Sequence, residues 1–333
     1  MAEGTDITGR PELSVSIETL STPWIGLGCA SFGSTCTDRQ GQSILDAAYH
    51  AGVRYLDTAR PYGYGKSEQI IGAWLRRVVR SEVVVASKIG RKIRSIHPAR
   101  RFLRQRIGRF ARRVIRGRRP QEIQRKETIR QTLKCADAGC LRESVSRSLD
   151  ALGTDYLDVL MLHSVGADAW DDDVIPALEE LICQGIVRRI GLATNRTDCE
   201  QLLACGVPAN VVQFPDSALW DRPIQWRPDR DVTVVTHSVL GRDGRMRQMM
   251  RDYFASNSQF RRRWNRVLGV EVASTAGVAE CLLRCALARN AGGGVLCGVS
   301  RPQQVKAIRR IIDSPLEPAL VHELQRTLQT CFR

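Results

Sequence analysis

The stretch "YLDVLMLH", residues 156–163, is an almost unbroken run of apolar residues. Such runs are typical of strands in parallel sheets, because helices cover both faces of the sheet. A segment with helical periodicity follows at residues 171–184. Together they predict a strand followed by a helix, which is the repeating unit of α/β folds.

This strand and helix unit recurs along the chain. The expected strands read "WIGLG", "VRYLD", "EVVVASK", "YLDVLMLH", "VRRIGLAT", "NVVQF", "VTVVTH" and "GVLCGVS". The segments with helical periodicity are 40–51, 67–79, 138–151, 171–184, 196–205, 276–290 and 301–312, with a weaker pattern after "NVVQF". Eight such units in 333 residues predict a closed (β/α)8 TIM barrel, and a doubly wound open sheet is the alternative.

The composition is that of a globular protein with a sizeable core, since 43% of the residues are hydrophobic. No apolar run approaches the roughly 20 residues that a helix needs to cross a bilayer, and the beginning of the chain does not resemble a secretion signal. We therefore expect a cytoplasmic protein without a membrane span. The 11 cysteines include no C-x-x-C pair, so reduced and mostly buried thiols are expected and no metal site is predicted.

The formal net charge of +15 is concentrated in one segment. Between Arg91 and Arg130 basic residues greatly outnumber acidic ones, and this segment interrupts the succession of strands and helices. We therefore expect one barrel domain over residues 1–333, with a basic insertion at about 91–134 after the third strand. Apolar residues within it recur at helical spacing and predict a helix. They are Leu103, Ile107, Phe110 and Val114.

The insertion admits three interpretations. It is a solvated lid without a specific partner, or a positive rim that attracts an anionic substrate or one tethered to an acidic carrier. The third interpretation is binding to a membrane surface or to nucleic acid. Nucleic acid is disfavoured because this block offers only Phe102 and Phe110 for stacking on bases.

Polar residues end or follow the expected strands. In TIM barrels the loops at the carboxyl ends of the strands build the active site. The polar residues at these ends are Asp57, Lys88, His163, Thr194, Asn195, Gln213, His237, Ser238, Ser300 and Arg301. Polar end caps would account for any one of them, but not for an acid, an ammonium and an imidazole at one mouth. These residues therefore predict an active site.

Tyr62, in the stretch "RYLDTARPYGYGKSE" at 54–68, adds a phenol to this set. A tyrosine ionises near pH ~10, and a neighbouring ammonium such as that of Lys88 favours the phenolate and lowers this pKa. Asp57 would hold Lys88 charged and in place, and His163 would donate a hydrogen bond to a substrate carbonyl. No side chain carries a hydride, so carbonyl reduction by this group implies a nicotinamide cofactor.

Stretches spread over nearly the whole chain carry a family resemblance. They are "IGLGCASFG", "YLDTARPYG", "VVVASKIG", "SLDALGTDYLDVLMLH", "ALEELICQGIVRRIGLATN", "NVVQF" and "GVSRPQQV". With them the sequence resembles the aldo-keto reductases. The resemblance implies a catalytic tetrad of four side chains, with the tyrosine as general acid/base, and NADPH or NADP bound across the barrel mouth. By that resemblance the tetrad is Asp57, Tyr62, Lys88 and His163.

The resemblance also assigns residues to the cofactor. Thr194, Asn195 and Gln213 would bind the nicotinamide carboxamide. Arg301 would bind the adenosine 2′-phosphate, and because arginine suits phosphates this favours NADPH over NADH. The remaining cofactor contacts expected are Cys29, Ala30, Asp57, His237, Ser238, Val239, Leu240, Arg242, Gly298, Ser300 and Gln304.

The sequence departs from the family pattern at two places. His237 stands where many relatives stack a tyrosine on the nicotinamide. Ala307 and Ile308 stand where relatives often carry a Glu-Asn pair beside the adenine. Adenine contacts are therefore expected to rest on Ser300 and Gln304, and to be weaker than in those relatives.

Residues and resemblance together predict an NADP-dependent oxidoreductase that interconverts a carbonyl compound and an alcohol. The substrate would be an aldehyde, a ketone or an oxidised sugar. The alternative is a regulatory or sensor subunit that binds NADPH with little turnover. The intact tetrad disfavours that alternative, although fold alone does not settle function.

Overall fold

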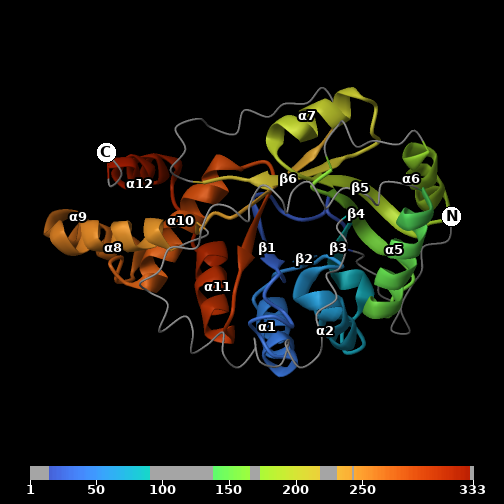
Figure 1. Ribbon diagram of the computed structural model, residues 1–333. Helices are drawn as coiled ribbons and strands as arrows, with labels where there is room; N and C mark the ends of the chain where they lie inside the picture. Colours follow the sequence, from blue (N-terminus) through green and yellow to red (C-terminus); the bar gives the residue numbers. More distant parts are fainter. Residues whose placement is uncertain (1–14, 91–137, 166–172, 218–230, 242–243, 331–333) are drawn as a thin grey trace, which may run out of the picture.

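The strands close on themselves in sequence order. The computed structural model describes residues 15–90, 138–165, 173–217, 231–241 and 244–330. The strands are β1 (Trp24–Gly28), β2 (Tyr55–Asp57), β3 (Val84–Ile89), β4 (Leu157–His163), β5 (Val187–Ala193), β6 (Val211–Pro215), β7 (Thr233–His237) and β8 (Gly294–Gly298). Each strand pairs in parallel with the next and β8 pairs with β1 (Figure 1). The predicted (β/α)8 barrel is therefore confirmed, and the open sheet is wrong.

The register places the carboxyl ends of neighbouring strands side by side. Gly28 pairs with Asp57 on β2 and with Gly298 on β8. Asp57 pairs in turn with Ala86, two residues before Lys88 on β3. Polar side chains that are far apart in the sequence thus meet at one mouth of the barrel.

Helices cover the outside of the barrel. They are α1 (Asp38–His50), α2 (Lys66–Leu75), α5 (Ala138–Leu152), α6 (Val174–Cys183), α7 (Arg196–Ala204), α10 (Thr275–Arg289) and α11 (Val305–Asp313), with short 3-10 turns η1 (Tyr62–Gly65), η2 (Arg80–Glu82) and η4 (Pro302–Gln304). α1 begins with a capping box, in which the Thr37 and Gln40 side chains each accept a hydrogen bond from the other's backbone N–H. α11 buries Val305, Ile308 and Ile311, which share one face at helical spacing.

An unexpected group of helices extends the barrel on one side. They are α8 (Arg245–Ser256), α9 (Ser258–Leu268) and α12 (Pro318–Thr330). α8 and α12 contact α10, α9 contacts α8, and Figure 1 shows the group away from α5 and α6. Phe254, Trp264 and Leu324 belong to its apolar core. The expectation of a single helix between the seventh and eighth strands is corrected, because α8 and α9 precede α10. α10 is buried on two faces, with Leu283 in the barrel's outer core and Cys281 in the core of the extension.

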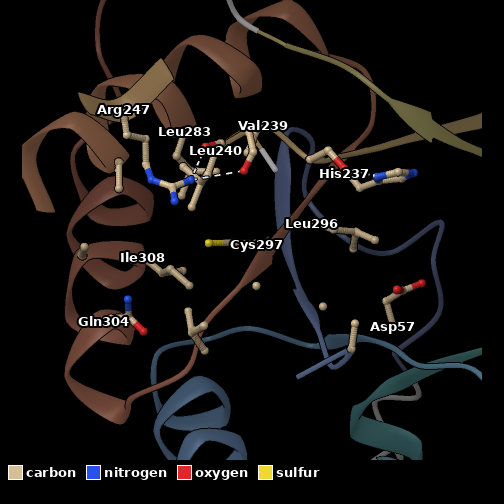
Figure 2. Close-up of a pocket in the computed structure, with 18 of the residues that line it drawn as sticks. Asp57, His237, Val239, Leu240, Arg247, Leu283, Leu296, Cys297, Gln304 and Ile308 are labelled. Carbon is tan, nitrogen blue, oxygen red and sulfur yellow. Dashed lines mark hydrogen bonds between the residues drawn. The ribbon is translucent and has the colours of Figure 1, made fainter. Parts of the chain in front are cut away.

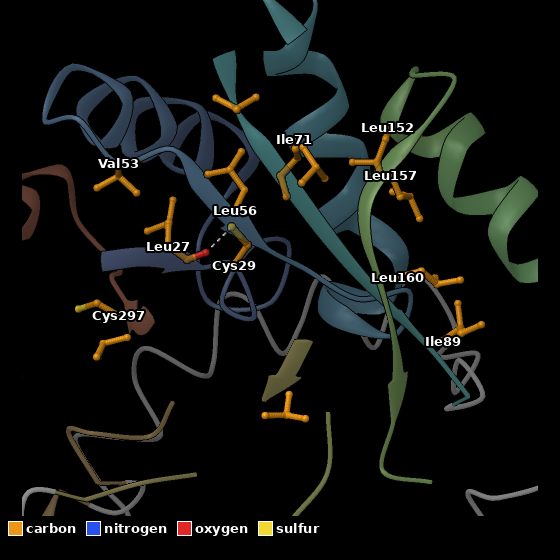
Figure 3. Close-up of a cluster of buried hydrophobic side chains, with 14 of the residues drawn as sticks. Leu27, Cys29, Val53, Leu56, Ile71, Ile89, Leu152, Leu157, Leu160 and Cys297 are labelled. Carbon is orange, nitrogen blue, oxygen red and sulfur yellow. Dashed lines mark hydrogen bonds between the residues drawn. The ribbon is translucent and has the colours of Figure 1, made fainter. Parts of the chain in front are cut away.

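Apolar side chains fill the barrel and also coat it. Successive residues of a strand alternate between the two faces of the sheet. Tyr55 and Val84 therefore join the cluster inside the barrel, while Leu56 and Val85 join the larger cluster under the helices. Figure 3 shows part of that larger cluster, including Leu27 and Leu56. Because the interior is packed with side chains, a ligand has to bind at the mouth.

The predicted basic insertion at 91–134, including its helix, lies outside the described residues. The described cysteines are free thiols, most of them buried. In the described part of the chain no helix has the length and apolar character needed to cross a membrane. Nor do three or more His, Cys, Asp or Glu side chains gather there in a way that could hold a metal ion.

Candidate active site

A cavity of about 800 Å³ lies at the carboxyl ends of the strands. Strand ends line one part of it, while α10 and α11 line another part (Figure 2). All four side chains of the predicted tetrad line this cavity: Asp57, Tyr62, Lys88 and His163. Enzymes with this fold bind their substrates in cavities at this end of the barrel.

Asp57 and Lys88 form a buried ion pair in the cavity wall. The Lys88 ammonium also donates to the carbonyl oxygen of Thr58 at 3.1 Å. Burial alone would lower the pKa of Lys88, but the Asp57 carboxylate and the Tyr62 hydroxyl outweigh it and raise that pKa. Burial raises the pKa of the Asp57 carboxyl, and the Lys88 ammonium offsets part of this increase. Lys88 therefore keeps its positive charge at neutral pH.

A tight turn brings Tyr62 to the ion pair. Tyr62 begins η1, in which Gly63 and Tyr64 have left-handed φ angles of 56° and 60°. A Cβ on Gly63 would lie 2.0 Å from the carbonyl oxygen of Phe32, so this turn requires glycine. The Nζ atom of Lys88 lies 5.1 Å from the centroid of the Tyr62 ring, and the two side chains share a hydrogen bond. The phenol thus lies beside a fixed positive charge.

His163, at the end of β4, faces this phenol. The two rings meet edge to face, with their centroids 6.1 Å apart and their planes at 88°. The imidazole is largely buried and lines the same cavity as Tyr62. A carbonyl oxygen in the cavity within reach of both the Tyr62 hydroxyl and an imidazole N–H of His163 would meet two hydrogen-bond donors.

A buried acid that the sequence analysis missed supports the strand that carries Lys88. Glu68 on α2 is fully buried and forms an ion pair with Arg60 at 2.8 Å. It also accepts a hydrogen bond from the Ser87 hydroxyl at 2.7 Å, and Ser87 immediately precedes Lys88. Because each partner satisfies another buried group, this network fixes the end of β3.

The side-chain amide of Gln213, on β6, contacts the tetrad through its hydrogen bond with Asp57. It is buried and hydrogen-bonded to Asp57. Its Oε1 is also buried, and among the described residues this oxygen has no hydrogen-bond partner. Because Gln213 lines the cavity, a buried acceptor without a partner marks a place for a donor on a ligand. The carboxamide of a nicotinamide carries such a donor, so this residue fits the predicted cofactor.

Thr194 and Asn195 follow β5, but neither is among the described residues that line the cavity. Their side chains donate to the Asp198 carboxylate at 3.1 and 2.6 Å. Asn195 also caps α7 by accepting from the Asp198 backbone N–H at 2.9 Å. Their expected contact with the carboxamide stays a prediction.

The end of β7 and the residues after it provide the next part of the wall. His237, Ser238, Val239 and Leu240 all line the cavity, and Figure 2 places His237 on the same side as Asp57. Ser238 has a left-handed φ of 64°, and its hydroxyl lies 2.8 Å from Nδ1 of His237. Arg242, which the sequence analysis also assigned to this wall, lies outside the described residues.

Arg247 on α8 is a cation in the cavity wall that the sequence analysis did not find. Its guanidinium donates to the carbonyl oxygens of Leu240 and Gly241, the second at 3.2 Å (Figure 2). Within the described residues no carboxylate pairs with Arg247, whereas Lys88 is paired with an acid. An arginine whose charge is not neutralised suits an anionic group of a ligand. No signal pointed to it, because α8 itself was not expected.

At the strand ends of β1 and β8, Ala30 and Gly298 line the cavity. Cys29 is fully buried, and its thiol donates to the carbonyl oxygen of Leu27 at 3.6 Å. The structure therefore brings two of these three predicted cofactor contacts to the cavity wall.

Beyond β8, Gln304 lines the cavity, whereas Ser300 and Arg301 are exposed and outside the described lining. Oε1 of Gln304 accepts from the backbone N–H groups of Ser300 and Arg301 at 2.8 and 3.0 Å. These bonds fix the start of α11 beside the cavity.

The sequence is similar to known proteins over most of its length. A sequence profile described as the aldo/keto reductase family matches residues 24–328. The chain is 31% identical over 185 residues to a D-threo-aldose 1-dehydrogenase of Pseudomonas sp, which covers 54% of this chain and only 52% of that relative. It is 27% identical over 266 residues to an NADH-specific methylglyoxal reductase of Escherichia coli (strain K12), which covers 77% of this chain and 73% of that relative.

Solved structures share the fold. An aldo-keto reductase from Bacillus halodurans in its holo form matches with a TM-score of 0.66 and 22% identity, over 94% of this chain and 95% of that one. An aldo-keto reductase from Klebsiella pneumoniae, solved in complex with NADPH, matches with a TM-score of 0.64 and 21% identity, over 94% of each chain.

Proposed function

The chain belongs to the aldo/keto reductase family, and on that basis we propose that it is an NADPH-dependent oxidoreductase that interconverts a carbonyl compound and the corresponding alcohol. The observation that carries the proposal is the convergence of Asp57, Lys88, Tyr62 and His163 on one cavity. An ion pair beside a phenol provides proton transfer, and an imidazole across from it provides orientation.

In the proposed reaction, NADPH supplies the hydride when it is bound. Tyr62 gives its proton to the carbonyl oxygen, and takes it back from the alcohol in the reverse direction. Lys88 favours the resulting phenolate, because an adjacent positive charge stabilises the anion. Asp57 holds Lys88 in position, and His163 orients the carbonyl oxygen towards the phenol.

The choice of NADPH over NADH rests on arginine. Arg301 is exposed beside the far end of the cavity, and among the described residues no carboxylate neutralises it. A 2′-phosphate would give it a charge-assisted partner. The relatives differ in cofactor: one is an NADH-specific reductase, and another was solved in complex with NADPH.

For the substrate we propose an aldehyde, a ketone or an oxidised sugar. The likeness to a D-threo-aldose 1-dehydrogenase supports the sugar. An anionic substrate, or one tethered to an acidic carrier, would suit the basic insertion at 91–134, which lies outside the described residues.

Replacing the proposed proton donor tests this function. Tyr62→Phe is expected to lower kcat by ~10²-fold or more, because it removes general acid catalysis, while NADPH binding changes little. The assay follows NADPH oxidation with a panel of aldehydes, ketoses and quinones, and NADP reduction with sugars. Tyr64→Phe is the matched control, since Tyr64 lies on the same turn but outside the described lining of the cavity.

Full activity of Tyr62→Phe would mean that a group other than Tyr62 donates the proton. The second candidate function, a subunit that binds NADPH without turnover, predicts a different pattern. In that case the unmodified protein binds NADPH but oxidises it with none of the carbonyl compounds.

A further inference from the structure

A group of buried polar side chains lies on the outer side of the barrel wall, behind the tetrad. Thr58, Ser67, Glu68 and Ser87 are all fully buried. Successive residues of a strand point to opposite faces of the sheet, so Ser87 faces α2 whereas its neighbour Lys88 faces the cavity. Apolar side chains fill most of this layer between strands and helices, and a buried polar group is unfavourable there unless it is hydrogen-bonded.

These polar groups are hydrogen-bonded to one another and to several elements. The Thr58 and Ser67 hydroxyls lie 2.8 Å apart, and the Ser67 hydroxyl donates to the carbonyl oxygen of Cys29 at 3.0 Å. Thr58 follows β2 and Cys29 follows β1, so these bonds connect the start of α2 to the ends of both strands. The burial of the two hydroxyls is therefore compensated.

Glu68 contacts both of the segments that carry the proposed proton donor and its ammonium. Its Oε1 accepts from the Ser87 hydroxyl at 2.7 Å, next to Lys88. Its Oε2 accepts from the Arg60 guanidinium at 2.8 Å, two residues before Tyr62. The backbone joins the same segments by a longer bond, in which the Arg60 N–H donates to the Lys88 carbonyl oxygen at 3.4 Å. One carboxylate thus connects the loop of Tyr62 to the strand of Lys88.

We propose that Glu68 is a positioning residue, which holds the Tyr62 phenol at the distance from the Lys88 ammonium that proton transfer requires. The inference rests on the proposed function, since it concerns the proton donor of that reaction. Glu68 lies outside the described lining of the cavity, so it acts through Arg60 and Ser87. An ammonium stabilises a phenolate less as their separation grows, so cutting either connection raises the pH at which Tyr62 ionises.

Titration of the phenol tests the inference without a substrate. The pH dependence of tyrosinate absorbance is recorded for each protein and for the same protein carrying Tyr62→Phe, and the difference isolates Tyr62. The ionisable groups around this phenol, Lys88, His163 and Asp57, are the same in every protein compared. Ser87→Ala is expected to raise the apparent pKa of Tyr62 by about half a unit or more, a factor of about three in its ionisation constant.

Ser148→Ala is the matched control, because the Ser148 hydroxyl is also fully buried but has no hydrogen-bond partner among the described residues. The control removes the same atom from α5 without cutting a connection to the tetrad, so its titration is expected to coincide with that of the unmodified protein. If the shift in Ser87→Ala exceeded that of the control by less than about half a unit, the inference would be overturned.

A double variant tests whether both connections run through the one carboxylate. Glu68→Gln keeps an oxygen that can accept from Ser87 but removes the charge that pairs with Arg60. It is expected to shift the titration in the same direction as Ser87→Ala. Because cutting either connection already breaks the link between the segments, the two substitutions together should shift it no further than the larger single shift. Additive shifts would overturn the inference, and Ser87→Ala decides it alone if Glu68→Gln does not fold.

Cofactor binding separates this inference from the proposed function. Ser87→Ala is expected to bind NADPH as the unmodified protein does, since Ser87 lies outside the described lining of the cavity. Loss of NADPH binding in Ser87→Ala would mean that the whole cavity is disturbed, and would overturn the inference. An unmodified protein that binds no NADPH would instead overturn the proposed function, whatever the titration shows.

Discussion

At the scale of single residues, two arginines near the cavity differ in what they can reach. Arg247 extends into the cavity and is held there by the carbonyl oxygens of Leu240 and Gly241. Arg301 is exposed at the start of α11, beside Gln304. In the proposed complex, Arg247 would meet the pyrophosphate that all nicotinamide dinucleotides share, and Arg301 would meet the 2′-phosphate that only NADPH has.

This division predicts two different losses. Arg247→Gln is expected to weaken NADPH and NADH alike, by about tenfold or more, since a hydrogen bond to a charged group contributes about 1.5–3 kcal/mol. Arg301→Gln is expected to weaken NADPH by a similar factor and leave NADH unchanged. Fluorescence titration of both cofactors with both variants measures this. If Arg247→Gln weakened the binding of NADPH but not of NADH, Arg247 and not Arg301 would be the residue that binds the 2′-phosphate.

Single residues also mark what the sequence could and could not reveal. The convergence of Asp57, Lys88 and His163 was predictable because a TIM barrel places strand ends at one mouth, and that of Tyr62 because it lies in the short loop after β2. Arg247 was not predictable, because no pattern in the surrounding sequence indicates that its side chain bonds to the carbonyl oxygens of Leu240 and Gly241. The pairing of Glu280 with Arg310 links residues 30 positions apart on two helices, so it depends on how those helices pack.

At the scale of elements, α10 is held at the cavity by a buried charge cluster. The Glu280 carboxylate lies between Arg284, whose side chain is 4% exposed, and Arg310 on α11. Arg284 also donates to the carbonyl oxygen of Ser314, beyond the end of α11, at 2.6 Å. The cluster therefore joins α10 and α11, the two helices that line this part of the cavity.

Removing the acid should destabilise the protein strongly. Glu280→Ala leaves Arg284 buried without its partner and is expected to lower the free energy of unfolding by about 3–5 kcal/mol. Glu180→Ala is the control, because the pair of Glu180 with Arg142 is exposed, and its loss is therefore expected to change the free energy of unfolding far less. Urea unfolding measures both. Equal and small effects would mean that the cluster does not hold the helices together.

The elements differ in how well sequence patterns predict them. The strands end within two residues of where the sequence predicts, because most are largely apolar runs in a parallel sheet, although β5 includes two arginines. α10 was found as well, but α8 and α9 were not, because the repeating unit leaves room for one helix after each strand. Trp264 and Phe254 become buried only because α10 offers a second apolar face to them.

At the scale of the whole molecule, closure of the barrel turns separate strand ends into one site. β2, β3 and β4 are neighbours, so Asp57, Lys88 and His163 arrive on adjacent strands at the same mouth. The helical extension then adds α8 and fixes α10, which together complete the cavity wall. The basic insertion at 91–134 lies outside the described residues, and its influence on substrate choice stays a prediction.

The central claim is that this chain transfers a hydride from NADPH to a carbonyl carbon with Tyr62 as proton donor. Isotope transfer tests it most directly, with NADPH that carries deuterium at both hydrogens of nicotinamide C4 and a panel of aldehydes and ketoses. Mass spectrometry of the products should find one deuterium on the new alcohol carbon, and Tyr62→Phe should form this labelled alcohol ~10²-fold more slowly or worse. A protein that binds NADPH yet yields no labelled alcohol with any carbonyl compound, or that labels as fast without the tyrosine hydroxyl, would contradict the claim.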